Sequence, residues 1–287
     1  MHYKTVKGIL SNKNGMNLYR GCSHGCIYCD SRSKCYAFTH DFEDIEVKAN
    51  ALNILEEELK KKRKKVMIGT GSMCDPYIPI EKDLKLTRGM LELILKYGHG
   101  VSILTKSNLI MRDIDLFDEI NKKSKAIVSM TLTTYDDKLT KIIEPNVSTT
   151  YERFLCLKEF KKRGIDIGIW FDPILPFIND NLENLEGLLK YFKELKPKYI
   201  LCFGFGLTLR DGNREYFYLK LDEYFPSLKE KYQRIYRNNY DIKSPNDKKL
   251  MKIFVDFCKE NEILYDIEEI FKYLNYLEEK NNQLSLF

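Results

Sequence analysis

Short apolar runs alternate with longer stretches of helical period from residue 66 to about residue 203. A strand buried on both faces is almost continuously apolar, whereas a helix that packs on one side repeats its apolar residues every three or four positions. Six runs fit strands, at residues 16–20, 66–70, 100–104, 126–132, 165–171 and 199–203. Strands that alternate with helices in this way predict βαβ units and hence an α/β fold with a parallel sheet.

Three helix faces lie between these strands. Each consists of large apolar residues at helical spacing, which we interpret as core positions rather than as a cofactor site. They are Leu52, Leu55 and Leu59; Met90, Leu91, Ile94 and Leu95; and Phe154, Leu157 and Phe160. The alternation stops after Gly212, which divides the chain into an α/β core at residues 1–212, a helical, tyrosine-rich extension at 213–280 and a flexible C-terminal tail at 281–287.

The composition narrows the class of protein. The chain has 287 residues, of which 44% are hydrophobic and 31% charged, enough for a full core and not typical of a disordered protein. Its formal net charge of +5 permits nucleic-acid binding without implying it. No uncharged apolar run reaches the roughly 18 residues that span a membrane, and the first residues lack the apolar core of a signal peptide. We therefore expect a cytoplasmic protein with no membrane contact and with reduced cysteines.

Three of the eight cysteines form a tight cluster. Cys22, Cys26 and Cys29 have the spacing C-x3-C-x2-C, and Gly21 and Gly25 give the backbone the freedom to wrap around a bound group. Three thiolates can hold three irons of a cubane cluster and leave the fourth iron open to a ligand. This spacing therefore favours a [4Fe-4S] cluster.

A structural zinc site is the alternative for this loop. It needs only one further ligand, which Cys35 or His24 could supply. The spacing lacks the paired C-x2-C knuckles that are typical of structural zinc, and we interpret His24 as a loop residue rather than a ligand.

The loop and the chain around it resemble the radical S-adenosylmethionine (radical SAM) superfamily, whose signature is C-x3-C-x-aromatic-C after the first strand of an incomplete (β/α)6 barrel. Within that superfamily the chain looks most like the spore photoproduct lyase-like group, also called DNA repair photolyase-like proteins. The resemblance runs from about residue 15 to residue 209. It rests on residues 71–81, 86–89, 104–107, 112–113, 128–131 and 144–145, and on Arg153.

The resemblance implies a [4Fe-4S] cluster held by the three cysteines, with S-adenosylmethionine chelated at the open iron and cleaved reductively to a 5′-deoxyadenosyl radical. It also implies that Tyr28 forms an aromatic wall of the site and that Ser72 meets the methionyl group. Lys106 and Ser129 are then expected to hold the carboxylate and the ribose. A one-electron donor such as flavodoxin or ferredoxin is the implied redox partner.

Arg153 is a further candidate for the cosubstrate carboxylate. The alternative is an ion pair, in which Lys106 or Arg153 faces a carboxylate, because buried cations are usually paired. The possible partners are Asp75, Glu144 and Asp172.

Cys74 is the candidate catalytic residue. Spore photoproduct lyases carry a cysteine after the second strand that returns a hydrogen atom to the repaired thymine, and Cys74 lies in that loop. When the following aspartate is aligned on Asp75, however, the donor falls nearer Ser72. The alternative is that Cys74 is a wall of the pocket, since free cysteines usually pack rather than react.

The extension interleaves basic and aromatic residues, with six tyrosines between residues 216 and 240. Cations can contact phosphates while rings stack on extruded bases, so this pattern suits DNA; packing of the tyrosines against the barrel is the alternative. The last five residues resemble the pentapeptide that binds the bacterial sliding clamp. The resemblance makes Gln283, Leu284, Leu286 and Phe287 the expected contacts, with self-docking onto the preceding helix as the alternative.

These observations lead to three functional hypotheses. The first is a radical SAM enzyme, a lyase-like repair enzyme for DNA lesions. The second keeps the radical chemistry but acts on RNA, a protein or a small molecule. The third is a zinc-stabilised adaptor that binds DNA or the clamp without catalysis.

Overall fold

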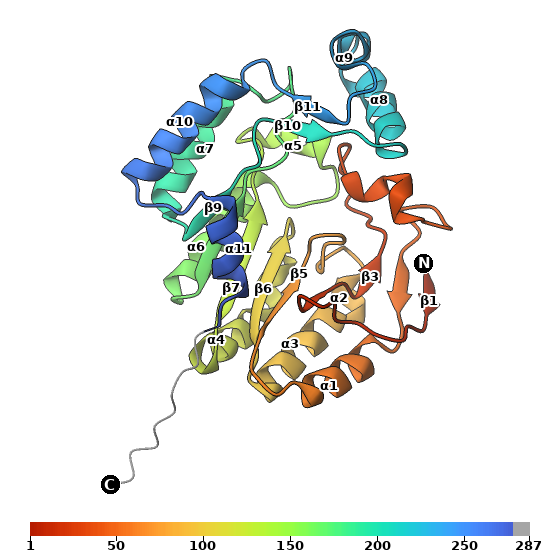
Figure 1. The fold of residues 1–287 in the computed structure, drawn as a ribbon, viewed down its shortest axis with the longest axis vertical. Coiled ribbons are helices and arrows are strands. Elements are labelled where there is room, and N and C mark those ends of the chain that lie inside the picture. The colour runs from red at the N-terminus through yellow and green to blue at the C-terminus, as the bar shows by residue number, and fades with distance from the viewer. Residues whose placement is uncertain (278–287) are drawn as a thin grey trace.

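The core of the protein is a six-stranded parallel sheet. The computed structural model describes residues 1–277, and Figure 1 shows the sheet in its centre. The strand order is β2-β5-β6-β7-β8-β9, with each strand beside its neighbour in the chain except at the step from β2 to β5. Their bounds are Gly15–Met16, Met67–Thr70, Gly100–Thr105, Ala126–Thr131, Asp166–Trp170 and Tyr199–Leu201. The predicted parallel α/β sheet is confirmed.

The prediction of a single strand over residues 16–20 is wrong. This segment splits into β2 and β3 (Tyr19–Arg20), which belong to different sheets. β3 pairs antiparallel with β4 (Glu46–Lys48), and β4 pairs parallel with β1 (His2–Lys4). The split occurs because Lys48 binds both carbonyls of the intervening dipeptide, Asn17 through its side chain at 2.6 Å and Leu18 through its backbone N–H at 3.2 Å.

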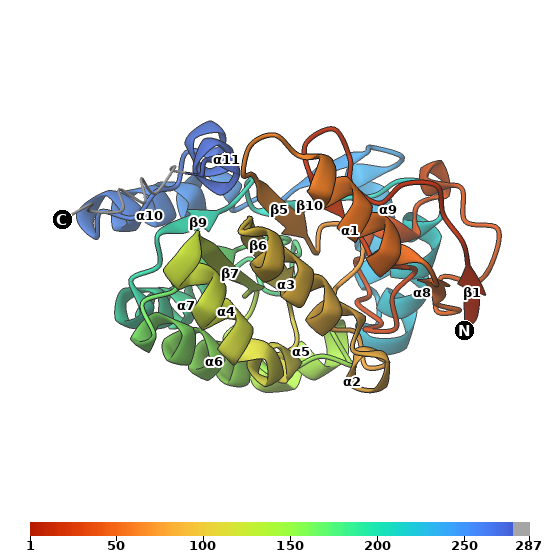
Figure 2. The same ribbon diagram turned by 90° about the horizontal axis from the view of Figure 1, so that it is seen from below.

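Helices cover one side of the six-stranded sheet (Figure 2). The predicted faces are confirmed, since Leu55, Leu59, Met90, Leu157 and Phe160 are all buried in one core. The α-helices of this part are α1 (Ala51–Lys61), α2 (Glu81–Leu84), α3 (Leu86–Tyr97), α4 (Ile114–Lys123), α5 (Asp137–Ile143), α6 (Thr150–Lys162) and α7 (Leu182–Leu195). Short 3₁₀ helices are η1 (Asp30–Arg32), η2 (Lys34–Tyr36) and η3 (Asn108–Asp113).

The C-terminal extension packs back onto the barrel. It contains α8 (Asn213–Tyr224), α9 (Leu228–Tyr236), α10 (Asp247–Glu260) and α11 (Ile267–Asn275). It also contains a strand, β11 (Asp241–Lys243), that pairs with β10 (Gly206–Thr208), where only helices were expected. α10 contacts α7, and α11 contacts β9 on the side of the sheet opposite α4 and α6 (Figure 2). Within residues 1–277 no helix is both long and apolar enough to cross a membrane.

Candidate active site

The three clustered cysteines lie in a loop between β3 and η1. Gly21 and Gly25 have positive φ angles of 86° and 72°, which side-chain-bearing residues rarely adopt. A Cβ atom on Gly21 would lie 2.5 Å from the carbonyl oxygen of Phe42, so this position also requires the absence of a side chain. The two glycines therefore let the chain curl around the cysteines, as the sequence predicts.

A second segment, residues 143–146, holds this loop in place. The N–H of Ile27 donates to the carbonyl of Ile143 at 3.0 Å. The N–H of Asn146 donates to the carbonyl of His24 at 3.1 Å, and its side-chain amide donates to the carbonyl of Ser23 at 3.0 Å. Three hydrogen bonds to backbone carbonyls thus attach the loop to this one segment.

The sulfurs of Cys22, Cys26 and Cys29 are not grouped as closely as the ligands of a single metal ion. In residues 1–277 only one group of three possible metal ligands lies mutually within 4.8 Å, and it contains no cysteine. Three thiolates on one tetrahedral zinc ion would lie about 3.8 Å apart, because Zn–S bonds are about 2.3 Å long. In a cubane cluster each thiolate binds a different iron, which requires a wider triangle. The geometry therefore favours the cluster over zinc at Cys22, Cys26 and Cys29.

The aromatic residue of the motif is tied to a buried ion pair. The Tyr28 hydroxyl donates to Glu144, and Glu144 pairs with Arg153 at 2.5 Å. The Arg153 guanidinium also donates to the carbonyls of Thr131 and Ser148, both at 2.8 Å. Arg153 is fully buried and its donors are engaged by protein. The structure thus shows the ion pair that was the alternative to cosubstrate binding by Arg153.

Lys106 directly follows β6 and lines the same pocket as the cysteines. Burial lowers the pKa of this lysine, but the negative charges of Cys26 and Glu144 outweigh it, so its pKa is raised. The Lys106 ammonium is 5.9 Å from the centre of the Tyr28 ring. A cation held at this depth is suited to an anionic ligand group.

Asp75 connects several residues on the other side of the pocket. Its carboxylate accepts hydrogen bonds from the backbone N–H of Lys106 and the hydroxyl of Thr105, both at 2.7 Å. It also lies 3.4 Å from Nδ1 of His24, which is buried. His24 is therefore paired with a carboxylate inside the loop. Asp75 links the strand end that carries Lys106 to the loop that carries the cysteines.

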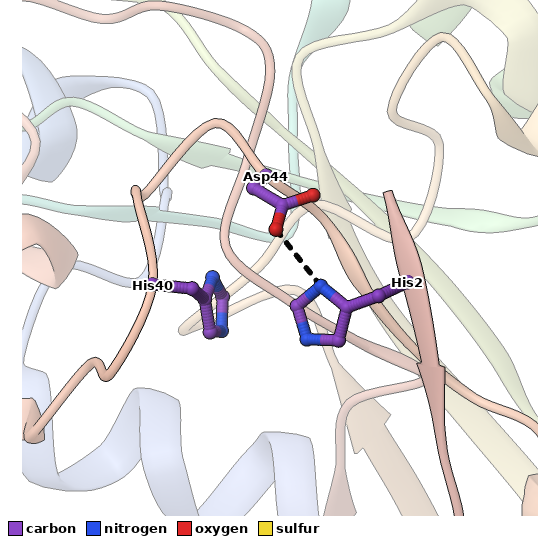
Figure 3. A group of neighbouring side chains, drawn as sticks. All are labelled: His2, His40 and Asp44. Carbon is purple, nitrogen blue, oxygen red and sulfur yellow. Dashed lines mark hydrogen bonds and ion pairs between the residues drawn. The ribbon is translucent and has the colours of Figure 1, made fainter.

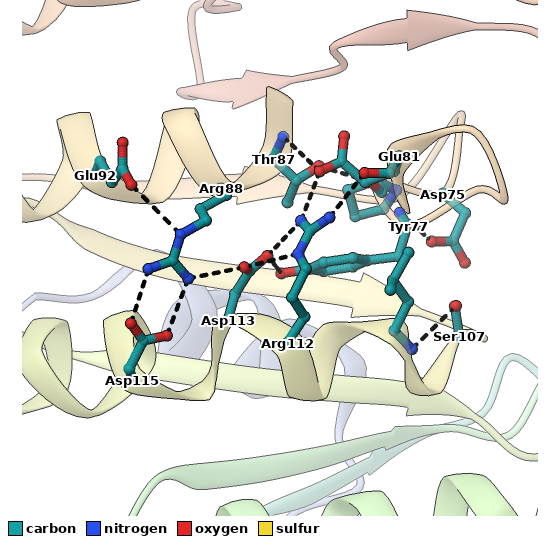
Figure 4. A network of polar contacts seen from close by, with 12 residues as sticks. Asp75, Tyr77, Glu81, Thr87, Arg88, Glu92, Ser107, Arg112, Asp113 and Asp115 are labelled. Atoms are coloured by element: carbon teal, nitrogen blue, oxygen red, sulfur yellow. Dashed lines mark hydrogen bonds and ion pairs between the residues drawn. The ribbon is translucent and has the colours of Figure 1, made fainter. Parts of the chain in front are cut away.

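Several of the other motif residues form an ion-pair network beneath this wall (Figure 4). Buried Glu81 pairs with Arg112 at 2.7 Å, and buried Asp113 pairs with Arg112 at 2.7 Å and Arg88 at 3.1 Å. The Tyr77 hydroxyl donates to Asp113 at 3.1 Å. This network anchors residues 75–81 to α3 and η3, so the stretches around Glu81, Arg88 and Arg112 support the site from behind.

A small pocket of about 80 Å³ brings the predicted residues together. Its lining includes the three cysteines, His24, Tyr28, Ser72, Cys74, Asp75, Lys106 and Thr131. A larger cavity of about 420 Å³ adjoins it inside the sheet, and Ser72 and Leu104 line both. The structure therefore places Tyr28, Ser72 and Lys106 at one pocket with the cluster loop, next to a space for a larger molecule.

Ser129 faces the larger cavity rather than the cysteine pocket. It shares a row across the sheet with Gly168 and Tyr199, and its hydroxyl is hydrogen bonded to that of Tyr199. A Cβ atom on Gly168 would lie 2.2 Å from the Tyr199 ring, so the glycine makes room for the tyrosine to reach across. Ser129 is thus engaged by protein at the wall of the cavity.

Cys74 is buried beside the cluster loop. Its thiol donates to the carbonyl of Gly21 at 2.8 Å. A hydrogen bond with Cys22 and burial both raise the pKa of the Cys74 thiol, which keeps it protonated. A protonated thiol is the form that can give up a hydrogen atom. Cys74 therefore lies in the wall of the cysteine pocket as a protonated thiol.

Sequence reasoning missed most of the larger cavity. Its lining includes Trp170, Tyr199 and three residues of α11, namely Phe271, Leu274 and Asn275. Nothing in the local pattern of α11 indicates that this helix closes the open side of the barrel, because that depends on packing across about 100 residues of chain. The sole tryptophan at a strand end was the one available signal. The predicted clamp contacts at Gln283, Leu284, Leu286 and Phe287 lie outside the described residues.

Comparisons with other proteins agree with this geometry. An uncharacterized protein of Mycobacterium tuberculosis is 30% identical over 235 residues, covering 77% of this chain and 66% of the relative. An uncharacterized protein of Methanocaldococcus jannaschii is 37% identical over 179 residues, covering 62% of this chain and 66% of the relative. The chain thus spans just under two thirds of the length of both relatives.

Among solved structures, spore photoproduct lyase complexed with dinucleoside spore photoproduct superposes with a TM-score of 0.64 at 13% identity, covering 92% of this chain and 80% of that one. Methylornithine synthase superposes with a TM-score of 0.52 at 14% identity, covering 88% and 63%. At these identities the likeness shows the fold, an incomplete α/β barrel.

The family itself is shown by a sequence model. The model of the radical SAM superfamily matches residues 16–192, which contain the cysteine loop, Cys74, Lys106 and Arg153. Members of this superfamily use a [4Fe-4S] cluster and S-adenosylmethionine, and the residues around the cysteine pocket fit both. The chain therefore belongs to the radical SAM superfamily.

Proposed function

We propose that this radical SAM enzyme acts on DNA as a lyase that reverses a pyrimidine lesion. The observation that carries the proposal is the convergence of the cysteine loop, Lys106 and the Cys74 thiol on one pocket beside a 420 Å³ cavity. The fold it shares with spore photoproduct lyase supports the choice of substrate class.

The roles of the residues follow from their positions. Cys22, Cys26 and Cys29 would hold the cluster and leave one iron open, and Ser72 and Lys106 would orient the methionyl end of S-adenosylmethionine. When bound, these two groups supply a 5′-deoxyadenosyl radical that abstracts a hydrogen atom from the substrate. Cys74 would give the hydrogen atom of its S–H bond to the product radical, and one electron from the redox partner with one proton would return its sulfur to the thiol.

Two exposed tyrosines beside half-buried cations support contact with DNA, although Arg210 and Lys220 also pair with Asp30 and Glu223. The Arg210 guanidinium lies 5.0 Å from the ring of Tyr240, and Lys220 lies 5.6 Å from the ring of Tyr224. Both tyrosines are exposed. Cations can contact phosphates while the rings stack on bases.

Three of the other tyrosines have the packing role that was the alternative considered from the sequence. Tyr218, Tyr232 and Tyr236 are buried, and the hydroxyls of the last two donate to backbone carbonyls. These three pack the extension onto the barrel. The proposal for DNA therefore rests on Arg210, Tyr240 and their exposed neighbours.

We propose that the reaction takes place in the cytoplasm. All eight cysteines are free thiols, which suits the reducing cytoplasm and a one-electron donor such as flavodoxin or ferredoxin. A contact of the C-terminal tail with the sliding clamp would bring the enzyme to DNA.

The test is turnover of damaged DNA under anaerobic conditions. The cluster-loaded enzyme, a reductant and S-adenosylmethionine are incubated with thymine-rich oligonucleotides irradiated to contain spore photoproduct, with unirradiated oligonucleotide as control. We expect lesion-dependent return to thymine, and weaker DNA binding by Arg210→Ala at unchanged cleavage of S-adenosylmethionine. Cleavage of S-adenosylmethionine with no effect of any oligonucleotide would refute DNA as the substrate and favour RNA, a protein or a small molecule.

A further inference from the structure

A second group of metal-binding side chains lies apart from the cysteine pocket. His2 in β1 and His40 and Asp44 in the loop before β4 place one donor atom each within 4.8 Å of one another. Figure 3 shows the two imidazoles facing each other, with the Asp44 carboxylate turned toward His2. No other group of three histidines, cysteines or acidic residues in residues 1–277 meets this spacing.

The fold brings these residues together from distant parts of the chain. β1 pairs parallel with β4, and the register sets His2 opposite Glu46. The chain between η2 and β4 then returns His40 and Asp44 to the same edge. The two imidazole rings meet edge to face, with centroids 4.6 Å apart.

The orientation of His40 is that of a metal ligand. Its Nδ1 lies 2.9 Å from the carbonyl oxygen of Asp41, so Nδ1 carries the proton and donates. Its Nε2 is then an acceptor, and that atom is buried with no hydrogen-bond partner in the part of the chain that the structure describes. Ligating histidines usually donate their other ring N–H to a carbonyl or carboxylate, which aims the free lone pair at the metal. An unpaired buried acceptor is otherwise costly.

Two carboxylates supply negative charge at the same place. Asp44 Oδ2 lies 2.9 Å from Nδ1 of His2. Glu46 is 5% exposed, and its Oε2 lies 3.8 Å from Nε2 of His2 and 4.0 Å from Nε2 of His40. Lys4, which is exposed, approaches the same oxygen at 3.2 Å, and the backbone ammonium of Met1 lies 2.5 Å from Oδ1 of Asp44. A divalent cation would take the place of the Met1 ammonium at Asp44 and would also be attracted to Glu46.

We propose that His2, His40 and Asp44, with Glu46 as a further ligand, bind one divalent transition-metal ion of the zinc class. Two imidazoles and one or two carboxylates without a thiolate are a common ligand set for Zn²⁺. The ion would fasten residues 40–46 to β1. Because the carbonyl of Phe42 accepts a hydrogen bond from the N–H of Cys22 at 3.1 Å, it would also steady the start of the cluster loop.

The direct test measures bound zinc in the cluster-loaded protein. The anaerobic holoprotein is given a small excess of Zn²⁺, passed through a gel-filtration column, and assayed for zinc and iron by mass spectrometry and for zinc ligation by X-ray absorption. We expect one zinc per chain in addition to the cluster iron, surrounded by nitrogen and oxygen at about 2.0–2.2 Å. No retained zinc, or zinc with sulfur neighbours at about 2.3 Å, would overturn the proposal, because sulfur ligation would place the ion in the cysteine loop.

Substitutions of the proposed ligands test where the zinc ion binds. We expect His40→Ala and Asp44→Asn each to weaken zinc binding more than tenfold, and added zinc to raise the melting temperature of the wild type but not of these variants. Asp41→Asn is the matched control, because Asp41 contributes its carbonyl and not its exposed carboxylate. Circular dichroism checks folding, and if His40→Ala is misfolded the nearly isosteric Asp44→Asn decides. Equal zinc affinity in all variants would contradict the assignment.

Discussion

The hydroxyl of Tyr28 donates a hydrogen bond to the carboxylate of Glu144 in the wall of the cluster pocket. Tyr28 belongs to the cysteine motif, whereas Glu144 ends α5 more than a hundred residues later. Since Glu144 is also paired with buried Arg153, the motif is attached to the barrel through a charged, fully desolvated network. This attachment explains why residues far from the cysteines belong to the same functional unit.

Glu144→Gln would leave the Arg153 guanidinium buried without its counter-ion. Burial raises the pKa of Glu144, but the positive charges of Arg153 and Lys106 have the larger effect, so the pKa is lowered overall and the carboxyl is ionised. Removing this negative charge leaves the buried charge of Arg153 without a partner. Breaking a buried ion pair in this way costs about 3–5 kcal/mol. We expect a matching loss in the free energy of urea unfolding and lower iron retention.

Glu92→Gln is the matched control for this variant. Glu92 pairs with Arg88 at 3.5 Å and is 57% exposed, and exposed pairs contribute less than about 1 kcal/mol. Similar stabilities of the two variants would contradict a structural role for the Glu144 pair.

Lys106→Met should weaken binding of S-adenosylmethionine. The substitution keeps the apolar stem and removes the cation that lines the cysteine pocket. A hydrogen bond to a charged group contributes about 1.5–3 kcal/mol, so we expect the KM for S-adenosylmethionine to rise by about 10- to 100-fold with iron content unchanged. Lys82→Met, at an exposed position outside the pocket, should leave KM unchanged. An unchanged KM in Lys106→Met would remove Lys106 from the cosubstrate site.

Cys74→Ser should separate radical formation from product formation. The O–H bond of serine is much stronger than the S–H bond of cysteine, so serine cannot donate the hydrogen atom. We expect 5′-deoxyadenosine still to form while the yield of repaired thymine falls at least tenfold. Cys35→Ser, at an exposed thiol outside the pocket, controls for loss of a sulfur. Normal repair by Cys74→Ser would make Cys74 a pocket wall alone.

The sequence predicted the sheet and the cluster loop because both depend on local pattern. Apolar runs identify strands that are buried on both faces, and the spacing of Cys22, Cys26 and Cys29 fits a cluster without knowledge of the rest of the chain. The directions of individual side chains depend on distant partners. Ser129 is bonded to Tyr199 only because Gly168 leaves a path between them, and Arg153 is engaged by Glu144.

The split of residues 16–20 has a similar cause. The apolar pattern is compatible with one strand. Lys48, however, donates hydrogen bonds to the two intervening carbonyls, and the chain continues as a strand of a second sheet. A contact between residues about 30 positions apart cannot be predicted from the local pattern of apolar residues.

His99 predicts a pH dependence of stability far from the active site. Burial, and then the charge of Lys65, lower the pKa of His99 from 6.5 to about 4, while its Nδ1 accepts the N–H of Val66 at 3.1 Å. Because its folded pKa is depressed, the unfolded chain binds more protons between pH 6.5 and 4. Stability is therefore full above about pH 6.5 and falls as the pH drops toward 4.

The measurement compares wild type with His99→Gln. Between pH 7 and pH 5 the wild type should lose about 2 kcal/mol of unfolding free energy through this group alone. His99→Gln should be less stable at pH 7 and should lack this part of the pH dependence. Parallel stability curves for the two proteins would show that His99 is not the titrating group.

The central claim is that Cys22, Cys26 and Cys29 hold a cluster that cleaves S-adenosylmethionine. The most direct measurement quantifies iron and sulfide in the anaerobically purified protein and then 5′-deoxyadenosine after reduction with S-adenosylmethionine, in wild type, Cys26→Ala and the control Cys35→Ser. We expect about four irons per chain and 5′-deoxyadenosine in wild type and control, and neither in Cys26→Ala. Zinc in the cysteine loop without iron or sulfide, and no 5′-deoxyadenosine after anaerobic reconstitution, would contradict the account.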